Sequence, residues 1–297
     1  INIERVGTTA QSLVDSNTVE NILLSNYGAS QFIGMRLAGI SGWLKVGTNG
    51  ANRIGNTLNP TSIQNRGSGD TYGISVGGTT NQVLENSIVA GFTIGYGINA
   101  GGDFKGLLFT TTSGIASIQG NLVEQVSMSN TGASAFYGMD LSNAAFNIGT
   151  TVRNKINNIT NAGNSTSYGI RLGSGSSTMS NIGATGVGNT ITNFTGTSTG
   201  PLARIIGFGN TSGALVSVVA NRIGNLSSAG SFNGTFLNPF EATAAGILNN
   251  CFSYATTISS DTIYNISATN TGNFQNHVVG IGFKQNPYGS GVQTTVE

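Results

Sequence analysis

Charged residues, cysteine, histidine and proline are all scarce in this chain of 297 residues. Charged side chains make up 8% of the sequence, against roughly 25% in typical soluble domains. The 12 basic and 11 acidic residues form no run of one sign, so the sequence has no electrostatic footprint for nucleic acid or an acidic membrane. The single cysteine, Cys251, excludes an internal disulfide, and the single histidine excludes a Cys/His metal cluster.

Long apolar segments are also lacking, and no run approaches the roughly 18 residues that a membrane span needs. From these absences we expect no cofactor, no metal site, no nucleic-acid partner and no membrane span. Few charges and abundant Asn, Ser, Thr and Gly favour a secreted, extracellular or cell-surface location.

What the chain has in abundance is a repeat. A motif of the form Asn-x-Ile-x-Asn, with Val or Asp as occasional replacements, recurs at steps of 32 to 40 residues. A fixed period of this size is typical of a solenoid. The motif begins at Asn17, Asn52, Asn86, Asn121, Asn154, Asn189, Asn221 and Asp261.

A second marker, a glycine followed by an apolar residue, keeps step with the first. We assign it to Gly34, Gly73, Gly97, Gly138, Gly169, Gly207, Gly246 and Gly280. Such a column indicates a tight bend, or a place where the backbone packs too closely for a Cβ.

The units are built from Gly, Asn, Thr, Ser, Ile and Val, which disfavour the helices of other repeats with this period. Each unit holds three short apolar runs bounded by turn residues, which predicts three strands per coil. The sequence therefore predicts an all-β, right-handed parallel β-helix of about eight coils that forms one domain over residues 1–297.

Stacking the units gives two ladders. The β-branched ladder suits a buried, pleated surface and contains Ile54, Ile88, Ile156, Ile191, Ile223 and Ile263. The asparagine ladder suits a left-handed bend with amides bonded from coil to coil, and contains Asn21, Asn56, Asn158, Asn193, Asn225 and Asn265. Stacking also places Asp140 beside Arg171 as a surface ion pair.

Two insertions interrupt the regular spacing, at residues 101–114 and 227–244. Exposed aromatics on such loops bind partners or sugars, although we favour the alternative that they fold back to cover the solenoid wall. The candidate interaction residues are Phe104, Lys105, Leu107, Leu108, Phe109, Phe232, Phe236 and Phe240.

The acidic residues give little support for catalysis. Polysaccharide hydrolases and lyases need several carboxylates or a base converging on one bond. In our alignment of the repeats no two acidic residues fall at the same column of adjacent units, so we assign no catalytic residue and expect no enzymatic activity.

The wording of the repeat, Asn154-Lys155-Ile156-Asn157-Asn158-Ile159 followed by Tyr168-Gly169-Ile170-Arg171-Leu172, resembles the β-helical repeat regions of large secreted surface and adhesin-type proteins of Bacteroidota-type bacteria. The resemblance covers the whole chain but is a style of repeat, without a catalytic signature. It implies secretion and a role in adhesion or surface filaments.

We therefore expect a structural or adhesive module of an extracellular surface filament or appendage. Because the sequence starts and stops in the middle of a coil, we expect its ends to be continued or covered, by copies of itself as a homo-oligomer or by other segments of the same assembly. Cell-surface glycans are further candidate partners. The alternative is a glycan-binding or glycan-cleaving β-helix of the tailspike or pectinase type.

Overall fold

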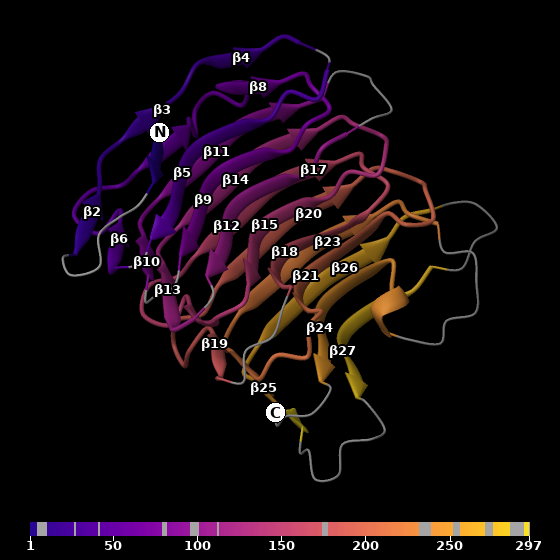
Figure 1. The fold of residues 1–297 in the computed structure, drawn as a ribbon. Helices are drawn as coiled ribbons and strands as arrows, with labels where there is room; N and C mark the ends of the chain where they lie inside the picture. The colour runs from indigo at the N-terminus through magenta and orange to yellow at the C-terminus, as the bar shows by residue number, and fades with distance from the viewer. Residues whose placement is uncertain are drawn as a thin grey trace.

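The chain folds into a right-handed parallel β-helix, as the repeat predicts. In the computed structural model the strands lie side by side from the indigo N-terminal end to the yellow C-terminal end (Figure 1). Every strand pairing is parallel, and each coil contributes strands to three sheets. The structure describes residues 1–4, 11–26, 28–40, 42–78, 82–95, 101–111, 113–173, 178–231, 239–251, 256–270, 276–285 and 294–296.

The three sheets are named A, B and C, and the chain visits them in the order C, A, B within a coil. Sheet A contains β1 (Asn2–Glu4), β5 (Phe32–Ile40), β9 (Thr71–Gly78), β12 (Phe104–Thr111), β15 (Phe136–Ser142), β18 (Thr166–Leu172), β21 (Arg204–Asn210), β24 (Ala244–Cys251) and β27 (Val278–Gln285). Sheet B contains β2 (Ser12–Val14), β6 (Leu44–Val46), β10 (Gln82–Glu85), β13 (Ile115–Gln119), β16 (Ala145–Ile148), β19 (Ser180–Ile182), β22 (Val216–Val219), β25 (Thr256–Ser259) and β28 (Thr294–Val296).

Sheet C has ten strands because it is split into two strands in each of its first two coils. It contains β3 (Thr18–Val19), β4 (Ile22–Leu24), β7 (Arg53–Gly55), β8 (Ile63–Asn65), β11 (Ile88–Ile94), β14 (Leu122–Met128), β17 (Lys155–Asn161), β20 (Thr190–Gly196), β23 (Arg222–Ser228) and β26 (Thr262–Ala268). A short 3-10 helix, η1 (Pro239–Glu241), precedes β24.

The core is a continuous column of apolar side chains inside the coils. Aromatic rings run through its first half, where Phe92 of sheet C lies between Phe32 and Phe104 of sheet A with ring centroids 6.0 and 5.2 Å apart. Phe136 continues the series to Phe194 with a centroid distance of 5.0 Å. Aromatic pairs at these distances contribute stabilisation beyond the burial of their apolar surface. Neighbouring coils are therefore joined by side chains as well as by the backbone.

The two sequence markers meet across this core. A Cβ on Gly138 would lie 2.6 Å from the carbonyl oxygen of Gly169 and 2.6 Å from the Cδ1 atom of Ile156. The same clash with the next glycine carbonyl, at 2.5–2.8 Å, recurs along this column from Gly34 to Gly246. Glycine is required here because the β-branched ladder of sheet C packs directly on the backbone of sheet A, which confirms the second of the two roles that the sequence suggests.

The glycine of the third unit is misassigned in the sequence analysis. The register pairs Lys105 with Tyr137 and Leu107 with Met139, so Gly106 holds the marker position. Gly97 lies outside the described residues. As a consequence the predicted insertion at 101–114 is wrong, because most of it is the regular strand β12.

Most of the β-branched ladder is confirmed. Ile54, Ile156, Ile191 and Ile223 are all buried, and Ile263 is partly buried against the core. Ile88 is a correction, because the register pairs Val89 with Ile54 and leaves Ile88 half-exposed. The cause is a slip of one residue: the unit starts at Ser87 and not at Asn86, and in a strand such a slip moves every side chain to the other face.

The asparagine ladder is confirmed for its later members, which adopt left-handed backbone with φ between 50 and 56°. Each side-chain amide donates to the oxygen of the one before, at 3.3 Å from Asn193 to Asn158, 2.9 Å from Asn225 to Asn193 and 3.0 Å from Asn265 to Asn225. Asn21 also has a positive φ of 59°. Asn56 does not. In that coil the left-handed residue is Gly55, one position earlier, and the side-chain amide of Asn56 donates to Glu20.

A second, inner amide ladder is formed by the first Asn of most motifs, with Ser87 and Asp261 at the same position in the third and eighth units. The Nδ2 atom of Asn154 donates to Oδ1 of Asn189 at 2.9 Å and to the carbonyl of Ile118 at 2.8 Å. Its own Oδ1 accepts the backbone N–H and the amide of Asn121. These buried amides satisfy backbone groups at the corner where sheet B turns into sheet C, so the most regular residue of the repeat is structural.

Candidate functional site

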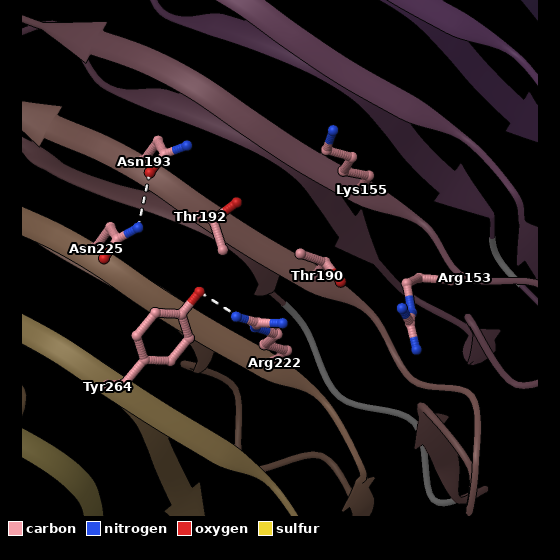
Figure 2. A pocket seen from close by; sticks show the side chains of 8 residues that line it. All are labelled: Arg153, Lys155, Thr190, Thr192, Asn193, Arg222, Asn225 and Tyr264. Atoms are coloured by element: carbon pink, nitrogen blue, oxygen red, sulfur yellow. Dashed lines mark hydrogen bonds between the residues drawn. The ribbon is translucent and has the colours of Figure 1, made fainter.

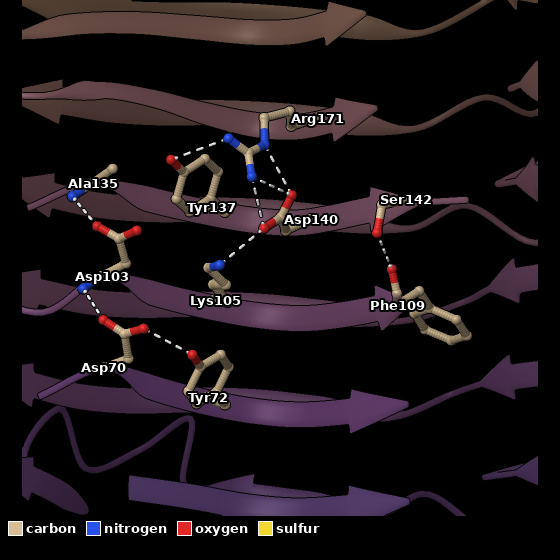
Figure 3. Close-up of polar contacts among 10 residues, drawn as sticks. All are labelled: Asp70, Tyr72, Asp103, Lys105, Phe109, Ala135, Tyr137, Asp140, Ser142 and Arg171. Atoms are coloured by element: carbon tan, nitrogen blue, oxygen red, sulfur yellow. Dashed lines mark hydrogen bonds and ion pairs between the residues drawn. The ribbon is translucent and has the colours of Figure 1, made fainter. Parts of the chain in front are cut away.

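Charged side chains gather with hydroxyl groups on two surfaces of the solenoid, one on the outside of sheet A and one on the outside of sheet C. On sheet A, Asp70 and Asp103 stand at the same column, directly before β9 and β12. The backbone N–H of Asp103 donates to Asp70 and that of Ala135 to Asp103, both at 2.9 Å (Figure 3). The hydroxyl of Tyr72 donates to the other oxygen of Asp70 at 2.7 Å.

This stack overturns the expectation that no two acids share a column in adjacent units. The misplaced glycine of the third unit hid it, because the same error displaced Asp103 from its coil. Burial raises the pKa of Asp103, partly offset by the N–H of Ala135, and burial together with the bond to Asp70 raises the pKa of Tyr72. Both carboxylates act as caps for the next strand, in the manner of the inner amide ladder.

The rest of this surface is an ionic network around Asp140, whose side chain is 6% exposed. Arg171 holds its two carboxylate oxygens at 2.8 and 2.9 Å, and Lys105 lies at 3.2 Å (Figure 3). The predicted pair of Asp140 and Arg171 is therefore confirmed, with Lys105 as a third member that the sequence analysis placed on a loop.

Tyrosine rings pack between these cations. The guanidinium of Arg171 lies 4.2 Å from the centroid of the Tyr137 ring, and the ammonium of Lys105 lies 5.5 Å from it. Tyr168 stacks on Tyr137 with a centroid distance of 6.0 Å. Burial raises the pKa of Tyr137 to about 12, so the hydroxyl stays protonated at neutral pH. We call Asp70, Tyr72, Asp103, Lys105, Tyr137, Asp140, Tyr168 and Arg171 the sheet A network.

The other surface is an open groove of about 390 Å³ that crosses β17, β20, β23 and β26 (Figure 2). We call it the sheet C groove. Its lining contains three cations, no acidic side chain and one aromatic ring. The lining residues are Arg153, Lys155, Thr190, Thr192, Asn193, Arg222, Asn225 and Tyr264.

The cations of the sheet C groove come from equivalent places in the repeat. Lys155 and Arg222 are each the residue after the first Asn of a motif, and the register stacks both with Thr190 between them. Arg222 donates from Nε to the hydroxyl of Tyr264 at 3.2 Å, and its guanidinium lies 5.0 Å from that ring (Figure 2). Arg153 donates to the carbonyls of 187 and 188. Among the described residues none of the three forms an ion pair.

The predicted interaction residues lie elsewhere. Phe104, Leu107 and Phe109 are buried in the core, Leu108 is half-buried, and Lys105 belongs to the sheet A network. Their assignment to an exposed loop is wrong. They belong to strand β12, and its buried apolar side chains point into the core.

The second insertion carries the other three predicted interaction residues. Phe232 and Phe236 lie outside the described residues, and Phe240 lies in η1 with a side chain that is also outside them. The described part of this insertion folds back on sheet A, where Ala242 is buried in a small apolar cluster with Tyr168, Ile206 and Leu248. That packing agrees with the wall-covering alternative.

The described part of the chain holds no group of three or more His, Cys, Asp or Glu side chains arranged to bind a metal ion. Nor does any helix in the described ranges have the length and hydropathy to cross a bilayer. The chain matches no protein-family model, and comparisons with curated proteins and with solved structures gave no match either.

Proposed function

We propose that this chain is a structural and adhesive module of an extracellular surface filament or appendage, whose partners are copies of itself or other segments of the same assembly. The observation that carries the proposal is the continuity of the three parallel sheets, each paired from coil to coil. The inner amide ladder joins the same coils a second time. The resemblance of the repeat to secreted surface proteins supports the extracellular location.

The mechanical argument is that each coil is fixed to its neighbours by several independent sets of bonds. To bend the rod or to separate two coils, backbone ladders, stacked amides and interlocked core side chains must all be disrupted together. A structure of this kind is stiff without disulfides or metal ions, which suits a chain with a single cysteine.

Electron microscopy of the protein isolated from its native source tests the proposal. We expect filaments, rods or hooks in which this chain is a component, identified by gold-labelled antibody to the chain. Separate compact particles without labelled filaments would overturn the structural role.

A glycan-binding or glycan-cleaving β-helix is the second candidate. The sheet C groove favours binding, because it presents cations, hydroxyls, amides and an aromatic ring on one open surface. For cleavage, the stacked carboxylates of Asp70 and Asp103 are the place to test. Incubation with acidic and neutral polysaccharides, followed by an assay for new reducing ends, decides this: release that is lost in Asp103→Asn would establish an enzyme. We expect no release.

A further inference from the structure

The sheet C groove brings three cations together, and among the described residues none of the three pairs with a carboxylate. Elsewhere the ion pairs are Arg36 with Glu4, and Lys105 and Arg171 with Asp140. In the sheet C groove no lining residue is acidic. An anion bound there would meet three cations that no carboxylate of the described residues neutralises by an ion pair.

The shape of the groove follows from an alternation of long and short residues along the stacked columns. Thr190 lies between Lys155 and Arg222 in one column, so the short hydroxyl leaves a hollow between two long cations. In the next outward column Gly224 separates Thr192 from Tyr264. A Cβ on Gly224 would collide with the ring of Tyr264, so the glycine allows the ring to lie flat across its strand.

The aromatic ring is also held in place. The bond from Nε of Arg222 to the tyrosine hydroxyl and the stacking of its guanidinium fix Tyr264 at the end of the groove. The same bond uses only one nitrogen of the guanidinium, which leaves the terminal nitrogens for an oxyanion such as a carboxylate or a sulfate.

Amides and hydroxyls fill the space between the charged groups. Thr190, Thr192, Asn193 and Asn225 line the floor, and the amide of Asn225 donates to Asn193 (Figure 2). The amide of Asn193 donates to both Asn157 and Asn158, whereas Asn225 keeps a second N–H beside its bond to Asn193. The row therefore offers hydroxyl and amide groups in successive coils, about 4.8 Å apart.

We propose that the sheet C groove binds an anionic polysaccharide that runs parallel to the solenoid axis. Its carboxylate or sulfate groups contact Lys155 and Arg222, its hydroxyls bond to the threonine and asparagine row, and a sugar ring stacks on Tyr264. The groove volume of about 390 Å³ is at the small end of ligand sites, which span roughly 300–1,000 Å³, so it takes a short stretch of the polymer.

The lining favours a sugar polymer over a single-stranded nucleic acid. A nucleic acid needs successive aromatic platforms for its bases and a continuous track of cations for its phosphates. The sheet C groove has one ring, and the intervening positions carry hydroxyls and amides, which match the many hydroxyls of a sugar. This inference deepens the adhesive part of the proposed function by naming the class of target, and it rests on that proposal for its biological meaning.

The test measures binding of the purified chain to four polymers by isothermal titration calorimetry. The probes are polygalacturonate for carboxylates, heparin for sulfates, dextran as a neutral polysaccharide and oligothymidylate as a nucleic acid. The variants are Arg222→Gln, Lys155→Gln and Tyr264→Ala. The matched control is Arg53→Gln, which removes the same charge as Arg222→Gln from an exposed position of the same column but outside the groove. Circular dichroism verifies that each variant keeps its β structure.

We expect the native chain to bind polygalacturonate or heparin and not dextran, with affinity that falls as salt rises. Arg222→Gln and Lys155→Gln should each weaken binding about tenfold, the loss of one charge-assisted contact, whereas Arg53→Gln should leave it unchanged. Tyr264→Ala should also weaken binding, through the loss of the stacking surface.

Three results would overturn the proposal. The first is no binding of either acidic polysaccharide, the second is an equal loss in Arg53→Gln, and the third is tighter binding of oligothymidylate that depends on Arg222. None of them bears on the filament role, because electron microscopy tests that separately. Labelled filaments combined with an inactive groove would retain the structural proposal alone.

Discussion

The outer faces of sheets A and C are built from the same kind of stacked column, but their cations have different partners. On sheet A, Arg171 follows Asp140 in one column, and Lys105 reaches the same carboxylate from the column of Tyr137 in the preceding coil. All three side chains are mostly buried, and both cations lie against the Tyr137 ring. On sheet C, Lys155 and Arg222 stand on either side of Thr190. The residue in the coil between two cations therefore decides whether those cations share a carboxylate or face the solvent.

The difference teaches how a solenoid separates stability from binding. A β-helix repeats the same backbone in every coil, so each outward column is a row of sites at a constant spacing of about 4.8 Å. An acid in the coil between two cations joins neighbouring coils by ion pairs, whereas a threonine in that coil leaves the two cations exposed. Neither choice changes the apolar core or the amide ladders.

The largest effect should come from breaking this arrangement on sheet A. Asp140→Ala leaves Lys105 and Arg171 facing each other without the carboxylate that both contact. We expect a loss of about 3 kcal/mol in the free energy of unfolding, since removal of one partner leaves the others partly buried and unpaired. Urea denaturation followed by circular dichroism measures it.

The conservative change Asp140→Asn sharpens the comparison further. If two unpaired cations in nearby coils are sufficient for a binding surface, Asp140→Asn should give sheet A a measurable affinity for polygalacturonate. A stability loss below about 0.5 kcal/mol in Asp140→Ala, the usual size for a surface substitution, would show that the network does not contribute to folding.

The inner amide ladder supplies a scale for these outer contacts. Asn154→Ala removes a buried side chain that both donates to and accepts from neighbouring coils. We expect a cost of about 2 kcal/mol from the unsatisfied groups that remain. Asn193→Gly, which keeps the left-handed backbone while removing an exposed amide, is the control and should cost less than half as much. Equal losses in thermal unfolding would contradict the distinction between the two ladders.

The end of the inner ladder should respond to pH. Burial raises the pKa of Asp261, and its Oδ2 atom has no hydrogen-bond partner among the described residues. The folded state therefore binds the proton more tightly than the unfolded state. This contribution to stability is complete below the ordinary pKa of an aspartate and is lost as the pH rises through the raised pKa.

The matching variant is Asp261→Asn. An amide at this position would donate to the carbonyl of Val218, which holds the place of Ile182 in the preceding coil. We expect higher stability at neutral pH. The profile of melting temperature against pH should also be flatter between about pH 3 and pH 7, the interval in which a carboxyl with a normal or raised pKa titrates. An unchanged slope would assign the acid dependence to another group, of which Asp103 is the first to test because its pKa is also raised.

The smallest effects should be at exposed cations. Arg222→Gln removes one bond to Tyr264 and no ion pair, and Arg36→Gln removes an exposed pair with Glu4. Each should change the free energy of unfolding by less than about 1 kcal/mol, because water screens such contacts. A large loss in Arg222→Gln would make the sheet C groove a stabilising element and would reverse the comparison.

The fold could be predicted from the sequence because the repeat encodes it in every coil. Ile156, Asn158 and Gly169 each belong to a column with one physical role. Because each column has one member in every one of the eight units, the period is clear. The prediction was wrong in the third unit, where Asn86 stands beside the true starting residue, Ser87, and Gly97 precedes the true marker, Gly106. Locally each of these fits the motif as well as the correct residue does, so only the strand register separates them.

The sites were harder to predict, for two physical reasons. The stack of Asp70 and Asp103 depends on the register of the misassigned unit. The sheet C groove was missed because its signal is a column, Lys155 and Arg222 after the first Asn of their motifs, and not a run along the chain. Charge clustering across coils is visible only after the units are aligned, and a count of basic residues per segment does not find it.

The glycine column sets the condition under which a solenoid of this kind can grow or break. Each glycine and the β-branched residue that packs on it come from adjacent units, so a tandem duplication of a whole coil copies both halves of the contact and yields a coil that fits its neighbours. A single-base change from a glycine codon to an alanine codon instead disrupts the packing between two coils and leaves intact solenoid on both sides of that contact. Such a rod should melt in two steps, since coils interact only with their nearest neighbours. The column that makes the rod continuous is therefore also the place where one mutation divides it.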